Sequence, residues 1–346
     1  MSRVSSHQLS AITMPILSIQ TPRSQVSLQS ERLVVVQPAE QNVNPKTEVP
    51  LEDLERVVLA RDVQISSAAL CELLKRQISV TVLEWNGRLL GSFEPPGPPR
   101  GASRLLQYRL CSNPVSCLAI AARLVHAKIA NGRRLLQRLD ANHHLLDAPV
   151  FAAMEAQERE AGNASDLATL RGWEGAAAAV FFESWAKFLP PEFPFCQRST
   201  RPPLNPVNAC LSYLSALVHG ELLTASVVRG LDPALGCLHQ TQDDRWSLPL
   251  DLMEPFRPAL IEALTLRMFS HRILQARHFE GHDGGVWLSL QGRRLLIQHY
   301  EQRVQREFFS EYTGCRTTLR QQLQNASLQF KLALGQPETY APFRVN

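Results

Sequence analysis

The sequence predicts an α+β protein in which a small β-rich N-terminal domain precedes a larger all-α domain. Up to about residue 93, hydrophobic residues form short runs separated by polar turn residues, as in strands. Beyond residue 104 they recur at helical spacing. Between the two parts, the segment EPPGPPRG at 94–101 holds four prolines and two glycines, which is too many for any regular element.

The length of 346 residues favours two domains and sets the expected boundaries. We expect an N-terminal tail (1–13), a β-rich domain (14–93), a Pro/Gly linker (94–103), a helical domain (104–310) and a C-terminal tail (311–346).

The composition is that of a globular protein, with 45% hydrophobic and 20% charged residues, and it excludes a disordered or fibrous chain. No run of about 18 apolar residues would span a bilayer, and the N-terminus lacks the apolar core of a signal peptide. We therefore expect a cytoplasmic protein without a membrane partner. The seven cysteines form no CxxC pair, so we expect small buried thiols in a reducing compartment rather than disulfides or a zinc ribbon.

Five short apolar runs predict the strands of the first domain: ILSI, LVVV, RVVL, VTVL and LLGSF. Asn86-Gly87 lies between the last two and indicates a hairpin turn. One helix is expected over 67–76, where apolar residues have helical spacing after a serine.

The second domain is expected to be almost entirely helical, interrupted by a proline-rich loop at 189–206 and by the segment 229–258. Helices are predicted at 105–110, 116–139, 148–161, 165–188, 206–230, 259–278 and 292–308. The helix at 116–139 is basic and has two interpretations. Its positive side chains could follow a phosphate backbone, or they could form a solvated face whose stems cover the core. These side chains are Arg123, Lys128, Arg133, Arg134 and Arg138.

Glu174 is the only charged residue between Arg171 and Glu183. Its helical neighbours are alanines and a phenylalanine, so its carboxylate projects from an apolar face. Burying an ionised carboxylate is costly unless it is paired or coordinates a metal. Both an arginine partner and a metal fit the sequence. Gly172 and Gly175 thin the helix surface around Glu174, which would let a ligand come close.

The segment 229–258 contains His239, Asp251 and Glu254. A metal site could include them, but a purely structural alternative exists. An N-cap residue followed by a glutamate at the third helical position is a capping box, which would account for Asp251 and Glu254 without a metal. Pro255 and Pro258 indicate that any helix here is kinked or begins later.

Several segments together resemble the first-numbered CRISPR-associated protein family, the integrase of spacer acquisition. They are RGWEGAAAAVFF, RPPLNPVNACLSYL, GLDPALGCLH, SLPLDLMEPFRP and GGVWLSLQGRRLLIQHYE, in this order. The stretch VVLARDVQISSAALCELLKRQISVTVLEWNGRLLGSF extends the resemblance to the β-rich domain, so that it covers roughly residues 14–310. One departure is visible at Leu214-Ser215, where members often carry an aromatic residue.

The resemblance implies a divalent metal held by Glu174, His239 and Glu254, with Asp251 as an auxiliary acid or a partner of a ligand. Two carboxylates and an imidazole suit Mg²⁺ or Mn²⁺, and the histidine favours manganese. The implied reaction is attack by the 3′-hydroxyl of a short DNA duplex on a phosphodiester at the edge of a CRISPR repeat. The metal would activate the hydroxyl and neutralise phosphate charge.

The family resemblance also implies partners. They are double-stranded DNA, a second copy of the chain contacted through the β-rich domain, and a small companion, the second-numbered CRISPR-associated protein. Four arginines near the motifs are candidate phosphate contacts: Arg198, Arg201, Arg245 and Arg257. Two alternatives remain open. One is a transposon-borne integrase or branched-DNA nuclease that uses the same site, and the other is a DNA-binding scaffold whose site has lapsed.

Overall fold

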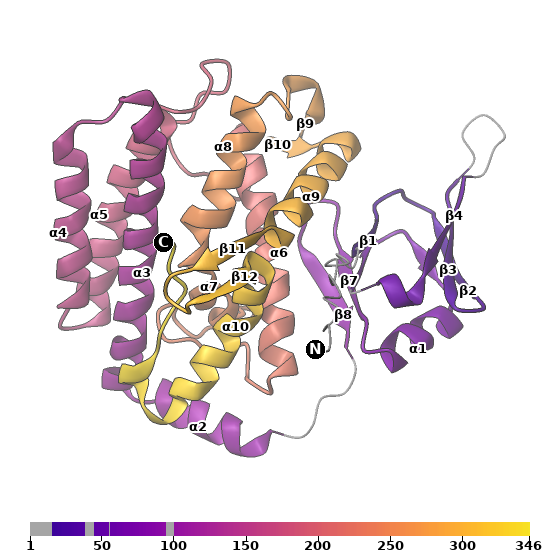
Figure 1. Ribbon diagram of the computed structural model, residues 1–346, viewed down its shortest axis with the longest axis horizontal. Helices are drawn as coiled ribbons and strands as arrows, with labels where there is room; N and C mark the ends of the chain where they lie inside the picture. The colour runs from indigo at the N-terminus through magenta and orange to yellow at the C-terminus, as the bar shows by residue number, and fades with distance from the viewer. Residues whose placement is uncertain (1–15, 39–44, 55, 95–99) are drawn as a thin grey trace, which may run out of the picture. The chain divides into compact units, whose positions relative to one another are not determined.

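The computed structural model describes residues 16–38, 45–54, 56–94 and 100–346 (Figure 1). These residues form two compact units. The first ends at Val82 and also includes Gly91 to Glu94, and the second comprises Leu83–Leu90 and residues 100–346. The expected N-terminal tail (1–13) and residues 95–99 of the expected linker lie outside the described residues. The linker was expected to reach residue 103, but helix α2 already begins at Gly101.

The first unit contains two four-stranded sheets. One has the order β1-β5-β7-β8 and pairs β1 with β5 in parallel, whereas the other has the order β4-β3-β2-β6 and is antiparallel from β4 to β2. All five predicted strands are present, together with three that the apolar runs do not indicate. The bounds are β1 Ile16–Ile19, β2 Gln25–Gln29, β3 Arg32–Val36, β4 Lys46–Pro50, β5 Arg56–Ala60, β6 Gln64–Ile65, β7 Ser79–Leu83 and β8 Leu89–Phe93.

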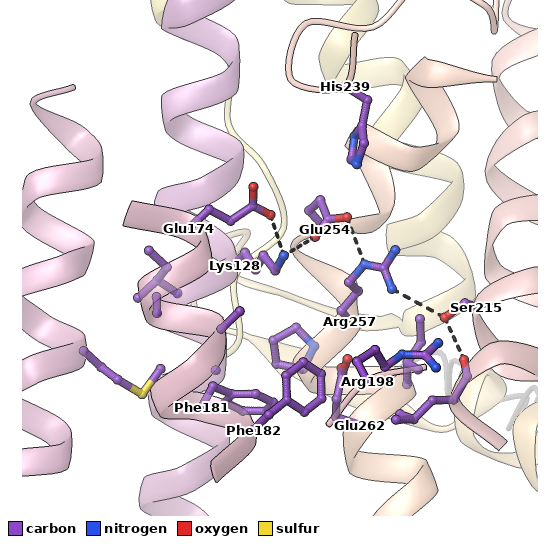
Figure 2. Close-up of a pocket in the computed structure, with 18 residues that line it drawn as sticks. Lys128, Glu174, Phe181, Phe182, Arg198, Ser215, His239, Glu254, Arg257 and Glu262 are labelled. Carbon is purple, nitrogen blue, oxygen red and sulfur yellow. Dashed lines mark hydrogen bonds and ion pairs between the residues drawn. The ribbon is translucent and has the colours of Figure 1, made fainter. Parts of the chain in front are cut away.

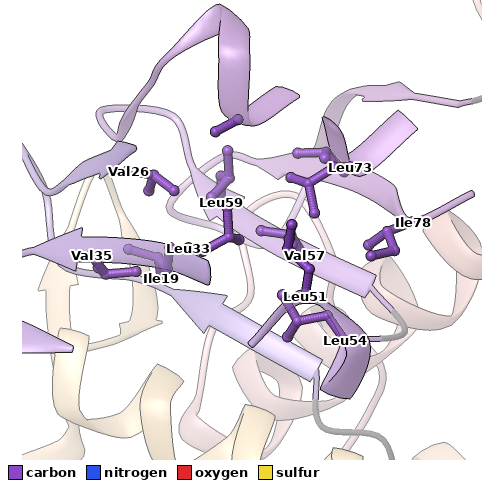
Figure 3. Packing of buried hydrophobic residues seen from close by; sticks show 12 residues of the cluster. Ile19, Val26, Leu33, Val35, Leu51, Leu54, Val57, Leu59, Leu73 and Ile78 are labelled. Carbon is purple, nitrogen blue, oxygen red and sulfur yellow. The ribbon is translucent and has the colours of Figure 1, made fainter. Parts of the chain in front are cut away.

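Helix α1 (Ser67–Lys75) completes this unit, and its N-cap is Ser66, whose side chain accepts a hydrogen bond from Ala69 N. Alternate residues of β3 and β5 point into one hydrophobic core, to which α1 adds Ala69 and Leu73 (Figure 3). The predicted hairpin turn at Asn86-Gly87 joins β7 to β8, and Gly87 there adopts a left-handed φ of +83° that favours glycine.

The second unit is largely helical, which confirms the predicted fold class. Helices α3, α4 and α5 pack side by side (Figure 1), and α6 contacts α7 and α10. Asparagine or aspartate side chains cap the N-termini of α3, α5 and α6. The bounds are α2 Gly101–Cys111, α3 Pro114–His143, α4 Ala148–Gly162, α5 Leu167–Ala186, α6 Pro206–Val228, α7 Ser247–Met253, α8 Ala263–Ser270, α9 Leu290–Gln305 and α10 Leu319–Leu332.

One of these helices, α6, is long and apolar enough to cross a membrane by length and composition alone. Helices α2 and α3, which are bent relative to each other, would also be long and apolar enough if they were counted as one span. In the apolar stretch of 18 residues within α6, 56% is buried inside the protein, as in the core helix of a globular fold.

Several local expectations for this unit were wrong. The unit is not all-α, because β9 (Phe279–His282) pairs with β10 (Gly285–Leu288), and β11 (Glu307–Ser310) pairs with β12 (Cys315–Thr318). The helix expected over 259–278 ends at Ser270. Residues 311–346, expected as a tail, contain β12 and α10, and Thr318 and Gln321 form the capping box of α10.

The cysteines also differ from the expectation of small buried side chains. All seven are free thiols, but only Cys117, Cys210 and Cys237 are buried. Cys71, Cys196 and Cys315 are exposed.

Candidate functional site

A cavity of about 280 Å³ lies inside the helical unit, and the three expected ligands Glu174, His239 and Glu254 all line it (Figure 2). Its walls come from α3, α5, α6 and the segment 254–262, which are far apart in the sequence. One part is polar and holds the carboxylates and basic groups. The other is apolar and is lined by Phe181 and Phe182.

Glu174 reaches this cavity from α5, and its partner is Lys128 of α3. Lys128 Nζ donates a hydrogen bond to Glu174 Oε1 at 2.6 Å. The same nitrogen lies 2.6 Å from Glu254 Oε2. One oxygen of each carboxylate therefore lies within 2.6 Å of the same nitrogen. A cation-binding position between Glu174 and Glu254 exists in the structure, and an ammonium group fills it.

Glu254 follows the last residue of α7, and its side chain is only 3% exposed. Arg257 Nε donates a hydrogen bond to Glu254 Oε1 at 2.9 Å. Burial alone would raise the pKa of Glu254, but the charges of Arg257, Lys128 and His239 outweigh it and lower the pKa to about 2. Lys128 shows the complementary balance. Burial opposes its charge, and the charges of Glu254 and Glu174 raise its pKa above the usual value.

His239 is oriented by Asp251, which is completely buried inside α7. Asp251 Oδ1 lies 2.7 Å from His239 Nδ1. A hydrogen bond to a carboxylate requires the proton on Nδ1, which leaves Nε2 of the neutral ring with a lone pair for a ligand. Burial lowers the pKa of His239, but the hydrogen bond and the charge of Asp251, with Glu254 and Glu174, outweigh it and raise the pKa.

The capping-box interpretation of Asp251 was wrong. Helix α7 begins at Ser247, four residues before Asp251, and its N-cap Trp246 has no side-chain cap. The Asp251 carboxylate instead accepts hydrogen bonds from three consecutive backbone amides that lead into the histidine. The donors are the N–H groups of Cys237 (2.5 Å), Leu238 (2.9 Å) and His239 (2.8 Å).

Two further residues fix the histidine loop. Arg171, one turn before Glu174 on α5, donates a hydrogen bond to Leu238 O at 2.6 Å. Gly236 lies so close to α7 that a Cβ there would meet Asp251 Oδ2 at 2.5 Å. Helix α5 therefore supplies one expected ligand directly and anchors the loop that carries another.

A π-helix at Arg257–Glu262 follows Glu254. Residues five apart differ by about 140° on an α-helix but lie closer to one face on a π-helix, whose wider turns are closed by hydrogen bonds between residues i and i+5. Arg257 and Glu262 consequently both line the cavity. Pro255 and Pro258 lack the backbone N–H that a continuous α-helix would need.

Glu262 is buried, and among the described residues its Oε2 has no hydrogen-bond partner. Burial raises its pKa to about 7, in spite of the opposing charge of Arg257.

The four candidate DNA-binding arginines differ in position. Arg257 and Arg198 line the cavity, whereas Arg201 and Arg245 are exposed and do not. The Arg198 guanidinium donates to Ser199 O, to both oxygens of Asn208 and to Ser212 Oγ. Burial, with the charge of Arg257, lowers its pKa to about 10.

The basic side chains of α3 fall into two groups. Lys128 and Arg133 are half-buried and form ion pairs, whereas Arg123, Arg134 and Arg138 are exposed and donate hydrogen bonds to backbone carbonyls. Lys128 contacts Glu174 and Glu254, and Arg133 contacts Glu158. Arg123 donates to Tyr340 O, and Arg134 and Arg138 donate to Asn346 O.

No three His, Cys, Asp or Glu side chains in the described part of the chain converge closely enough to hold a metal in this arrangement. Two of the three expected ligands nevertheless converge on one cation, and the third lines the same cavity with its Nδ1 already bound. Two carboxylates and one imidazole nitrogen form a donor set suited to Mg²⁺ or Mn²⁺. The residues present therefore fit a divalent metal once the ammonium moves aside.

Lys128, Arg171 and Glu262 are parts of this site that the sequence does not identify. In the sequence Lys128 is one of five basic residues on a predicted helix, and Arg171 only bounds the apolar stretch around Glu174. One signal was present for Lys128. Its helical neighbours at i±3 and i±4 are apolar or small, except for one asparagine, and all four are buried: Leu124, Val125, Asn131 and Gly132.

The fold and site define a class of protein: a β-sheet domain followed by a largely helical region whose cavity gathers two glutamates, a histidine and basic groups. The family model for CRISPR associated protein Cas1 matches residues 17–302. The chain belongs to this family.

Curated relatives agree with this assignment. A CRISPR-associated exonuclease Cas4/endonuclease Cas1 fusion of Rhodospirillum rubrum is 34% identical over 314 residues, which cover 88% of this chain and 53% of the relative. CRISPR-associated endonuclease Cas1 1 of Thermus thermophilus is 35% identical over 294 residues, which cover 85% of this chain and 89% of the relative. The chain thus spans about half the length of the fusion protein and most of the length of the Thermus protein.

Three solved structures have a similar fold. A CAS1 protein from Thermotoga maritima has a TM-score of 0.77 at 21% identity, covering 96% of this chain and 100% of that one. A casposase bound to integration product has a TM-score of 0.80 at 19% identity, covering 96% and 92%. A chain of a Cas6-RT-Cas1–Cas2 complex has a TM-score of 0.77 at 22% identity, covering 99% and 37%. At these identities the likeness establishes the fold alone.

Proposed function

We propose that this chain is a divalent-metal-dependent DNA endonuclease and integrase that inserts short DNA fragments into a CRISPR array in the cytoplasm of a prokaryote. The observation that carries the proposal is the convergence of Glu174 and Glu254 on one cation beside His239, whose Nδ1 is bound to Asp251. Membership of the Cas1 family supports the same activity.

In this proposal Glu174, His239 and Glu254 hold Mg²⁺ or Mn²⁺. When bound, such an ion neutralises charge on a phosphodiester and activates the attacking oxygen. The chain's own residues prepare the site. Asp251 keeps the proton of His239 on Nδ1, so that Nε2 can bind a ligand. Arg257 holds the Glu254 carboxylate at 2.9 Å and lies within the cavity, where a phosphate oxygen would meet its positive charge.

The proposed partners are double-stranded DNA, a second copy of this chain and the companion protein Cas2. The names of similar solved structures support them, since they include a Cas6-RT-Cas1–Cas2 complex and a TtCas1-DNA complex. Among the candidate arginines, Arg201 and Arg245 are exposed and Arg257 lines the cavity. We propose these three as phosphate contacts. Arg198 is bound to internal oxygens, which supports a structural role for it.

A second candidate function is integration of transposon ends. The fold similarity to a casposase bound to integration product favours it, with a TM-score of 0.80. The substrate separates the two functions. An integrase of spacers joins a short duplex at the edge of a CRISPR repeat, whereas a transposon-borne integrase needs its own terminal repeats.

The test is a strand-joining assay with purified protein, Cas2, a labelled duplex, a repeat-bearing plasmid and Mn²⁺. Glu174→Gln, His239→Gln and Glu254→Gln should each lower joining by at least about 100-fold, because loss of a metal ligand costs several kcal/mol of transition-state stabilisation. Glu183→Gln is the matched control, since Glu183 is exposed on the same helix as Glu174. It should leave joining unchanged.

Joining that survives all three ligand substitutions would contradict the metal assignment. Wild-type protein that joins strands no better than Glu254→Gln would show a lapsed site, which is the scaffold alternative. Joining that requires terminal repeats in place of the CRISPR repeat would favour the transposon function.

A further inference from the structure

Lys128 occupies the place where the proposed metal would bind. Its side chain crosses from α3 into the cavity and is 21% exposed (Figure 2). Its ammonium nitrogen is 2.6 Å from an oxygen of Glu174 and 2.6 Å from an oxygen of Glu254. A divalent ion between these carboxylates would lie about 2.0–2.1 Å from each ligating oxygen if it were magnesium. The ammonium and the ion therefore cannot share this position.

The two carboxylates that would hold the metal are balanced by the basic side chains in direct contact with them. Glu174 and Glu254 carry two negative charges, and Lys128 and Arg257 carry two positive charges. Two carboxylates this close together would repel each other strongly without a cation between them, particularly since Glu254 is almost completely buried. Lys128 thus removes the repulsion that would otherwise favour capture of a divalent ion.

We propose that Lys128 is a tethered cation that competes with the divalent metal, and that it moves from the carboxylates to a DNA phosphate when metal and DNA bind together. This proposal rests on the proposed metal site. The cavity gives the ammonium somewhere to go, since Lys128 lines it beside Arg257. A bound phosphodiester would supply there the negative charge that Lys128 loses on leaving the carboxylates.

Two consequences follow from this arrangement. Metal binding without DNA must displace an ion pair on each carboxylate, so the metal affinity is low. Metal binding with DNA transfers the ammonium to a phosphate, so each ligand increases the affinity for the other by the same factor. Lys128 acts through the metal ligands and is a positioning residue for the metal and the DNA.

The competing explanation is that Lys128 is only a structural ion-pair partner. The two explanations predict opposite effects of removing its charge. If Lys128 only supports the fold, replacing it disorders the carboxylates and weakens metal binding. If it competes with the metal, replacing it leaves two carboxylates without a cation, and metal binding becomes tighter.

The experiment is a titration of the full chain with Mn²⁺, in which free Mn²⁺ is followed by electron paramagnetic resonance. It is done with and without a duplex whose 3′ ends lack the hydroxyl, so that no joining occurs. Lys128→Met should bind Mn²⁺ about tenfold more tightly than wild type without DNA, a factor within the usual range of coupling between sites. Lys187→Met, at an exposed position following α5, is the control and should bind like wild type. DNA should tighten Mn²⁺ binding to wild type more than to Lys128→Met.

Lys128→Met that binds Mn²⁺ equally or more weakly would overturn the proposal, and Lys128→Gln repeats the test if the methionine variant does not fold. The variant Glu254→Gln distinguishes this failure from failure of the proposed function. If wild type binds Mn²⁺ through Glu254 but Lys128→Met binds no tighter, only the role of Lys128 is wrong. If Glu254→Gln leaves Mn²⁺ binding unchanged, the metal site is wrong, and the role of Lys128 falls with it.

Discussion

At the scale of single residues, two buried acids of the site have opposite surroundings. Asp251 accepts four hydrogen bonds, three from consecutive backbone amides and one from His239. Glu262 lines the cavity, and among the described residues its Oε2 accepts none. A satisfied buried carboxylate stabilises the loop that it binds, whereas an unsatisfied one favours its protonated form. The two acids therefore have different roles although both are buried near the expected metal ligands.

Glu262 makes the stability of the metal-free protein depend on pH. Its pKa is raised by burial to about 7 from the usual value of 4.5. The folded state thus binds more protons than the unfolded state between these values, and stability falls as the pH rises through this window. Below about 4.5 both states are protonated and the penalty is absent, and above about 7 it is present in full.

We expect Glu262→Gln to remove this dependence. In the presence of a chelator, the unfolding free energy of wild type should fall between pH 4.5 and pH 8, and that of Glu262→Gln should lack this fall. The difference, variant minus wild type, should therefore rise by on the order of 3 kcal/mol over this range. Urea unfolding at several pH values measures this difference, and Glu183→Gln on α5 is the exposed control, for which the difference should stay flat. A difference for Glu262→Gln that does not change with pH would contradict the assignment.

At the scale of elements, the site depends on how closely the histidine loop approaches α7. Gly236 leaves no room for a Cβ, which would lie 2.5 Å from Asp251 Oδ2 and 3.0 Å from Ser247 C. Gly172 on α5 is the opposite case, because nothing lies within 4 Å of a Cβ built there. The sequence singles out Gly172 and Gly175 as positions where another backbone or a ligand could come close, but among the described residues no atom lies within 4 Å of a Cβ built at either one.

The two glycines give a matched pair of substitutions. Gly236→Ala should destabilise the protein by about 1–3 kcal/mol, because overpacking separates the loop from α7. It should also weaken Mn²⁺ binding, since His239 moves with the loop. Gly172→Ala should stabilise the protein by about 0.5–1 kcal/mol, because alanine loses less backbone entropy in a helix. Thermal unfolding and Mn²⁺ titration of both variants check this, and equal effects of the two alanines would show that the loop tolerates a side chain.

At the scale of the whole molecule, the sequence predicts the parts better than their contacts. Local periodicity is enough to predict five of the eight strands described in the first unit and the long helices α3, α5 and α6, because each pattern is contained within its own element. Glu174 stands out because a single charge on an apolar helix needs a partner. The partner itself, Lys128, lies 46 residues away, and no local pattern connects the two.

Two kinds of element were missed for physical reasons. The segment 247–262 contains three prolines, and the sequence does not tell where helix α7 ends and the π-helix begins. The short strands β9 to β12 contain only four residues each, which is too short for a clear alternation. The resemblance to the Cas1 family, rather than spacing, joined His239 and Glu254 to Glu174.

The C-terminal segment, expected to be a tail, packs against the residues that follow Glu254. Asn131 on α3 donates from Nδ2 to Pro255 O at 2.7 Å and to Phe343 O at 3.1 Å, and its Oδ1 accepts from Val345 N at 2.9 Å. Phe343 stacks on Phe256, with ring centroids 4.5 Å apart. One amide therefore joins α3, the end of the chain and the residue that follows Glu254.

We expect Asn131→Ala to release this junction. It leaves the buried Pro255 carbonyl and two groups of the C-terminal segment without their partner, which should cost about 1–3 kcal/mol of unfolding free energy. Because Pro255 adjoins Glu254, Mn²⁺ binding should weaken as well. Asn142→Ala is the matched control on the same helix, since Asn142 is exposed, and its unfolding free energy should stay within about 0.5 kcal/mol of wild type. If Asn131→Ala unfolds and binds Mn²⁺ like Asn142→Ala, the C-terminal segment does not support the site.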